Sequence, residues 1–210
     1  MTPTPNPYPD LPKSRALREA AESLNLEHFA PPLAITFASR PGEPPRAKQP
    51  FDDPYYGNLY GRTRLTCRLC GECDLGCNEG SKNTLDHTYL SAATHHGADI
   101  RTLAEVTGIV PLDGGGFEVT YTQYGHDPDD SGDRSRTPVC IRCDSLFLAA
   151  GTFGTATLLL RNRVNLPALG RALGTRFSGN GDLLTFCMNA QAEGPTGRMR
   201  LIDGSLGPVI

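Results

Sequence analysis

Apolar side chains recur at helical spacing after Thr84, and this stretch organises the rest of the pattern. Leu85, Tyr89 and Ala93 lie four residues apart and would share one face of a helix. Thr84 is a residue type that caps the first turn, and Gly97 suits the end of a helix because glycine readily adopts the left-handed conformation. The pattern therefore predicts a helix between Thr84 and Gly97.

An extended apolar run follows this helix. Ile100, Leu103 and Val106 stand in a stretch that a sheet would bury, and we expect the strand to close at Val106. The central element of the chain is then a helix that leads into a strand.

Other segments repeat these two patterns. A helix is predicted from Ser14 and another from about Phe153, and strands are predicted over 33–37, 117–124 and 139–150. The last strand runs into a small-residue turn and then a helix, an arrangement in which a sheet edge often meets a cofactor. The apolar run through Phe186 is the final segment with a pattern, and no closing element is predicted after it.

Composition makes a loop-rich mixture of helices and strands the expected fold class, an α/β or mixed α+β chain. The 210 residues include 23 Gly and 18 Pro, and 38% are hydrophobic. The net charge of −3 gives no electrostatic case for nucleic acid. No apolar run approaches the roughly 20 residues of a membrane helix, and no secretory signal is recognisable. We therefore expect a cytoplasmic protein.

Four cysteines form a close cluster with the spacing C-x2-C-x2-C-x3-C: Cys67, Cys70, Cys73 and Cys77. This spacing is typical of a bacterial ferredoxin loop and makes an iron–sulfur cluster one interpretation. A zinc site that uses two of the four together with Cys140 and Cys143 is another. Since Cys140 and Cys143 are three apart in a predicted strand, their side chains would point to opposite faces, which weakens that site. The remaining interpretation is reduced thiols or a disulfide that fixes a loop.

Two pairs of stretches carry a resemblance to a known family. Lys82–Leu90 with Ile100–Val106, and Ala150–Arg161 with Gly174–Asp182, are similar in order and spacing to segments of the glucose–methanol–choline (GMC) family of FAD-dependent oxidoreductases, and in particular to its cholesterol oxidases. The resemblance covers about residues 60–187.

The resemblance implies an FAD site and assigns residues to it. The end of the strand at Val106 would touch the adenine through its backbone, and Ala150, Gly151 and Thr152 would lie along the flavin. A loop with Asn180, Gly181 and Asp182 would lead back into a substrate-binding domain. The family's chemistry is transfer of a hydride from an alcohol or sterol carbon to the flavin. Some relatives, the multi-subunit sugar dehydrogenases, carry an iron–sulfur cluster before the equivalent helix, so a cluster is compatible with this family.

The resemblance is also incomplete. The chain has no G-x-G-x-x-G motif for the FAD pyrophosphate, and none of its histidines occupies the catalytic position, so no catalytic residue is assigned. We expect an internal or truncated piece, poorly stable and inactive alone. Residues 1–77 would be a substrate-domain segment with the Cys-rich loop, 78–160 an FAD-domain segment and 161–210 a second substrate-domain segment. The alternative functions are a ferredoxin-like iron–sulfur electron carrier built on the Cys67–Cys77 loop and a non-catalytic interaction domain.

Overall fold

The computed structural model describes residues 7–126, 134–181, 188–203 and 205–207. The chain is a mixed α and β structure with small sheets. It divides into two compact units, one formed by residues 1–99 with 185–210 and the other by residues 100–184. Each unit is described by itself below, and the assignment of segments 1–77, 78–160 and 161–210 to cofactor and substrate domains stays a prediction.

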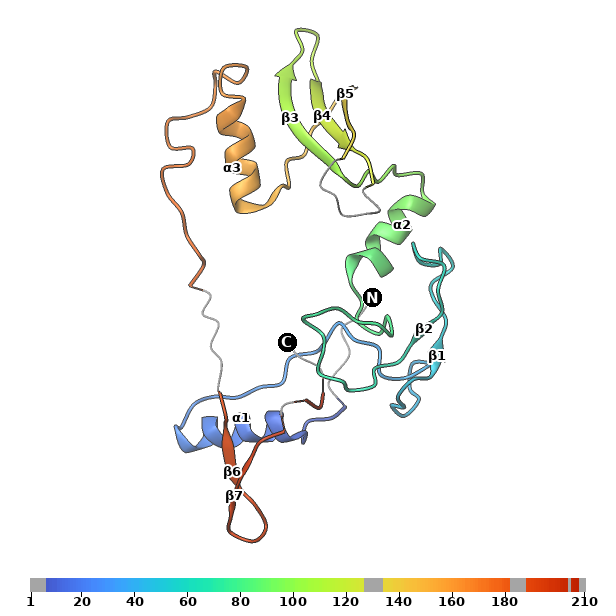
Figure 1. The fold of residues 1–210 in the computed structure, drawn as a ribbon, viewed down its shortest axis with the longest axis vertical. Helices are drawn as coiled ribbons and strands as arrows, with labels where there is room; N and C mark the ends of the chain where they lie inside the picture. Colours follow the sequence, from blue (N-terminus) through green and yellow to red (C-terminus); the bar gives the residue numbers. More distant parts are fainter. Residues whose placement is uncertain (1–6, 127–133, 182–187, 204, 208–210) are drawn as a thin grey trace. The chain divides into compact units, whose positions relative to one another are not determined.

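The unit of residues 100–184 is built on an antiparallel three-stranded sheet in the order β3-β4-β5, with one helix, α3, beside β3 (Figure 1). The bounds of these elements are β3 Ala104–Pro111, β4 Phe117–Tyr124, β5 Arg136–Cys143 and α3 Gly151–Arg161. One face of the sheet is apolar and supplies the buried side chains Ile109, Val119 and Tyr121. Leu158 of α3 is also buried.

The predicted strands of this unit differ in accuracy. The strand over 117–124 is confirmed as β4. The prediction of a strand that includes Ile100 and Leu103 and closes at Val106 is wrong at both ends. Leu103 is in the left-handed conformation, with φ of 54°, and β3 continues to Pro111. The strand expected over 139–150 ends at Cys143, where its partner strand β4 begins at Phe117 and offers no further pairing.

The unit of residues 1–99 with 185–210 has shorter elements joined by long irregular segments (Figure 1). Their bounds are α1 Pro12–Ser23, β1 Pro50–Phe51, β2 Arg64–Leu65, the 3₁₀ helix η1 Leu85–His87, α2 Tyr89–His95, β6 Gln191–Glu193 and β7 Met199–Leu201. Its core is a cluster of the buried side chains Leu33, Ile35, Phe37 and Cys67. The first helix begins two residues earlier than predicted, with Pro12 at its start, a position where the missing N–H costs nothing.

The single helix predicted between Thr84 and Gly97 is divided in two at Thr88. The Thr84 side chain makes no capping bond and instead donates to the Asp86 carboxylate, while the Thr88 hydroxyl donates to the Thr84 carbonyl at 2.9 Å. Such local side-chain bonds compete with helix formation. The stop at Gly97 is confirmed: its φ is 92°, and the N–H groups of Gly97 and Ala98 close back onto the last turn.

Two other segments of this unit depart from the pattern. The strand expected over 33–37 is reduced to isolated bridge residues at Leu33 and Ile35, of which Ile35 pairs with Lys82, although Leu33, Ile35 and Phe37 are buried. A β6–β7 hairpin lies near the end of the chain, where no element is predicted. The apolar run through Phe186 is outside the described residues.

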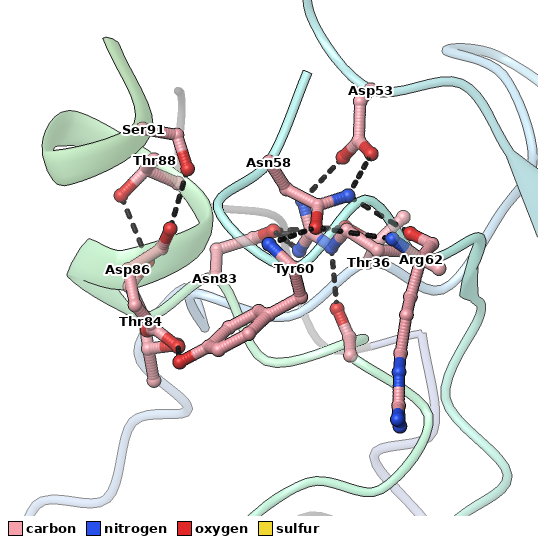
Figure 2. A network of polar contacts seen from close by, with 12 residues as sticks. Thr36, Asp53, Asn58, Tyr60, Arg62, Asn83, Thr84, Asp86, Thr88 and Ser91 are labelled. Carbon is pink, nitrogen blue, oxygen red and sulfur yellow. Dashed lines mark hydrogen bonds and ion pairs between the residues drawn. The ribbon is translucent and has the colours of Figure 1, made fainter. Parts of the chain in front are cut away.

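A buried arginine holds the irregular segments of this unit together. Two of its partners, Asp53 and Asn83, are labelled in the network of polar contacts in Figure 2. The Arg64 side chain is 1% exposed and lies over the Phe51 ring at 4.8 Å. Its Nε donates to the Gly80 carbonyl at 2.7 Å, Nη2 to Asn83 Oδ1 at 2.6 Å, and Nη1 pairs with Asp53 at 3.4 Å. One side chain thus ties the segment that follows β1, at Asp53, to the segment that precedes η1, at Gly80 and Asn83.

Among the described residues, no helix has both the length and the apolar character needed to cross a membrane. The cytoplasmic location expected from the sequence stays a prediction.

Candidate cofactor groove

A groove of about 540 Å³ lies within the unit of residues 100–184. Its walls are the first half of β3, the segment between β5 and α3, and one face of α3. The lining residues are Ala104, Glu105, Val106, Val119, Leu146, Phe147, Leu148, Ala149, Ala150, Phe153, Gly154, Thr157, Leu158 and Arg161. The lining is mostly apolar, with a carboxylate at Glu105 and a guanidinium at Arg161.

The helical wall of the groove is a regular stripe. Ala150, Phe153, Gly154, Thr157, Leu158 and Arg161 fall at intervals of three and four residues, so they share one face of α3. The side chains of this stripe are small at Ala150 and Gly154, apolar at Leu158 and cationic at Arg161. A flat aromatic ligand with an anionic extension would match that sequence of surfaces.

Asn162 fixes α3 to the edge of β3. It is 4% exposed, and its Oδ1 accepts from the Ile109 N–H at 2.9 Å. Its Nδ2 donates to the Thr107 carbonyl at 3.1 Å and to the Leu158 carbonyl at 2.9 Å. Asn165 adds a bond to the Ile109 carbonyl at 3.3 Å. The two asparagines therefore occupy the outer edge of β3 at Ile109 and hold the end of α3 against it.

The backbone of Val106 is turned to this same outer edge. In an antiparallel pair, residues alternate between facing the partner strand and facing away with both N–H and C=O. Ile109, which pairs with Val119, faces away, since its N–H and C=O bond to the asparagines. Val106 pairs with Tyr121, two residues further along β4, so its N–H and C=O also face away. The N–H and the C=O of Val106 therefore lie beside the groove at the edge of β3. The sequence had predicted that they would lie at the end of a strand.

The first turn of α3 borders the groove. Gly151 has a φ of 74°, and a Cβ there would meet nothing within 4 Å, so its backbone conformation is what requires glycine. The Ala150 N–H donates to Thr155 Oγ1 at 3.1 Å. The first turn of α3 contains no acidic residue. No side chain of that turn therefore neutralises the positive partial charge at the N-terminal end of the helix.

The structure brings some of the sequence-predicted residues together. Val106 and Ala150 line the same groove. Gly151 and Thr152 follow Ala150 in the first turn of α3 but are not among the lining residues. Asn180 and Gly181 are exposed, with φ of 58° and 72°, and do not line it either. The chain leading to them is attached to α3 by Phe177, whose ring stacks on Phe153 at 5.3 Å. Asp182 lies outside the described residues.

Sequence reasoning missed Glu105, Phe153, Arg161 and Asn162. The stripe on α3 was available as a signal, because positions 150 to 161 repeat at helical spacing. Glu105 accepts from the Tyr124 hydroxyl at 2.7 Å, and this bond raises the pKa of Tyr124. Asn162 carried no signal, because a polar residue after a helix is usually solvated.

The cysteine cluster lies in the other unit, packed on the core around Phe37. The described cysteines are all thiols, and the seventh, Cys187, is outside the described residues. In the part of the chain that the structure describes, no three Cys, His, Asp or Glu side chains are grouped to hold a metal ion, so an iron–sulfur cluster is not supported. Cys140 and Cys143 sit on opposite faces of β5, as their spacing predicts, and do not form a joint site.

Comparison with known proteins gives the family. The family model described as GMC oxidoreductase matches residues 61–176. A cholesterol oxidase of Acinetobacter baumannii is 31% identical over 179 residues, which are 81% of this chain and 31% of that protein. Cholesterol oxidases of two Mycobacterium tuberculosis strains are 33% identical over 164 residues, 76% of this chain and 27% of theirs. No solved structure gives a significant match. The chain belongs to the GMC oxidoreductase family, and it spans about a third of the length of these relatives.

Proposed function

We propose that the groove beside β3 receives the adenine end of FAD, and that the chain is the corresponding part of a flavoenzyme that oxidises a CH–OH group. The FAD-binding character of the matched family supports the cofactor. The observation that carries the assignment is the outward-facing backbone of Val106, beside a mostly apolar groove that Ala150 also lines. An adenine ring offers a donor and an acceptor on one edge, which an N–H and a C=O can match.

The residues present fit this part of the cofactor. Phe147 and Phe153 offer aromatic side chains to the base, and Arg161, at the end of α3, offers positive charge to a phosphate. The bound flavin would supply hydride acceptance from the alcohol carbon. The residues of this chain would bind and orient the nucleotide. No catalytic base is assigned among them.

The substrate class follows from the relatives alone. Those reported above are cholesterol oxidases, so we propose a sterol or a related alcohol as the substrate of the whole enzyme. Inactivity of the 210-residue chain by itself is part of the same proposal. The ferredoxin-like alternative is not carried forward, because the described cysteines are not grouped as metal ligands.

The test uses a substitution that removes one backbone donor. Val106→Pro deletes the N–H that faces the groove, and proline is tolerated on an edge strand where that N–H is not needed for pairing. Val106→Ala removes side-chain atoms but keeps the N–H. Titration of the ¹⁵N-labelled full chain with ADP should shift the amides of residues 104–106 and 147–154 saturably in wild type and in Val106→Ala.

In Val106→Pro we expect ADP affinity to fall about fivefold to tenfold, the value of one hydrogen bond of about 1 to 1.5 kcal/mol. FMN, which lacks adenine, should leave the amides of residues 104–106 unchanged. Shifts confined to residues outside the groove, or equal affinity in the two variants, would reject the adenine assignment.

A further inference from the structure

The four clustered cysteines all face one small cavity, independently of the groove described above. Cys67, Cys70, Cys73 and Cys77 line a space of about 10 Å³, which holds roughly one water molecule. The loop that carries them is fixed on both sides. The Gly207 N–H donates to the Leu69 carbonyl at 2.9 Å, and Lys82 Nζ donates to the Cys73 carbonyl at 3.0 Å. The four cysteines are therefore held around one cavity within a packed loop.

Cys77 borders more open space than the other three, although Cys73 also lines one of the outer cavities. Cys77 lines two further cavities of about 480 and 440 Å³, the first together with Tyr60 and Arg62 and the second together with His87. Cys67 and Cys70 line only the small inner cavity among these three. Cys77 is thus reachable from outside on one side and faces other thiols on the other.

The surroundings of the Cys77 sulfur suit a negative charge. Its Sγ lies 3.1 Å from Ser81 Oγ, and backbone N–H groups of Glu79, Ser81 and Lys82 point to it. Burial raises the pKa of the Cys77 thiol, but these hydrogen bonds outweigh burial and hold the pKa below its usual value. Cys67 is the opposite case: burial and the neighbouring sulfurs keep its pKa raised. The two thiols are therefore suited to different roles.

We propose that this pocket is a peroxide-sensitive thiol site, in which Cys77 is oxidised first and is then joined to a second cysteine of the pocket. The Cys77 thiolate attacks hydrogen peroxide, the O–O bond breaks, and a sulfenic acid and hydroxide form. A neighbouring thiol then attacks the sulfenic sulfur, so that a disulfide and one water are produced. The two sulfurs lose two electrons in total and the peroxide gains them. A dithiol reductant reverses the step by exchange.

The experiment is peroxide oxidation of the reduced full chain, followed by alkylation of the remaining thiols and peptide mass spectrometry. We expect loss of two thiols per chain, with Cys77 linked to Cys67, Cys70 or Cys73. Cys77→Ser should slow thiol loss from the pocket about tenfold or more, because the reactive thiolate is gone. Cys140→Ser, which removes an exposed cysteine of β5, should leave the rate unchanged.

A second variant keeps every cysteine and so does not depend on the folding of Cys77→Ser. Ser81→Ala removes the hydroxyl beside Cys77 and should slow its oxidation several-fold while the same disulfide still forms. The proposal is overturned if the pocket thiols stay reduced while Cys140 oxidises. It is also overturned if the purified chain carries one equivalent of zinc or iron and its thiols react only after chelation.

Discussion

The two units of the chain satisfy their buried polar groups in different ways. In residues 100–184 a neutral amide, Asn162, closes the gap between one helix and one strand edge. In the other unit a charged guanidinium, Arg64, bonds to three groups in two separate segments. Regular strands satisfy their own backbone, so the first unit leaves few groups to be bonded by side chains. Irregular loops leave more, and the five donors of an arginine can serve several of them at once.

The largest effect should come from removing the charged group. Arg64→Ala takes away the partners of the Gly80 carbonyl and of Asn83, and it leaves the Asp53 carboxylate without its cation. Breaking a buried ion pair on one side typically costs about 3 to 5 kcal/mol. We expect a loss of that size in the free energy of unfolding, measured in urea from NMR signals of residues 33–95.

Arg62→Ala is the matched control for this substitution. Its side chain is exposed, and the described bonds of Arg62 to Asn58 use backbone atoms, so its effect should stay within about 0.5 kcal/mol. If the two alanine variants were equally stable, the arginine would not be what holds the loops together.

A smaller effect should follow from removing the neutral amide. Asn162→Ala leaves the Ile109 N–H, at a residue only 1% exposed, without its acceptor. An unsatisfied buried group of this kind costs about 1 to 3 kcal/mol. We expect faster hydrogen exchange at Ile109 and weaker ADP shifts in the groove, because α3 is no longer fixed to the strand edge.

The control within the same edge is Asn165→Ala. Asn165 is itself half-buried and makes a longer bond, 3.3 Å, to the Ile109 carbonyl, so a loss under about 1 kcal/mol is expected. Equal losses for the two asparagines would mean that the amide of Asn162 is not specifically the link between helix and strand.

The same contrast explains what the sequence could predict. Phe117–Tyr124 was assigned correctly because β4 is the central strand, and its alternating side chains are buried on one face. The strand before it was misplaced because the left-handed Leu103 leaves no mark in an apolar pattern. Arg64 could not be found at all, since a single arginine between loops normally indicates an exposed position.

The candidate site was predictable to a similar degree. Val106 and Ala150 came from the family resemblance, and the structure places them in one groove. The reason given for Val106 was wrong in detail, because its backbone faces outward from a strand edge and not from a strand end. The pairing register decides which backbone groups face outward, and the register depends on a partner strand that lies 15 residues along the chain, at Tyr121.

The smallest effect should come from a half-buried charge, Asp86, which sharpens the contrast with the fully buried Arg64. Burial raises the pKa of Asp86, but hydrogen bonds from Thr84 and Tyr60 outweigh it and hold that pKa below the ordinary value. Tyr60 donates to the carboxylate at 2.7 Å. Because the folded-state pKa is depressed, the charged form stabilises the fold above the unfolded pKa of about 3.9. That stability is lost as the pH falls through the folded value.

Asp86→Asn removes this titration. The difference in unfolding free energy between wild type and Asp86→Asn should be constant from about pH 7 to pH 5 and should shrink below about pH 4, where the unfolded chain begins to take up the proton. Tyr60→Phe deletes one of the two side chains that donate to Asp86. In this variant the loss of unfolding free energy at low pH should be smaller than in wild type but should not disappear. A difference that grows as the pH falls would mean that the folded-state pKa of Asp86 is raised, and the bonds from Thr84 and Tyr60 would then not be the dominant influence on this carboxylate.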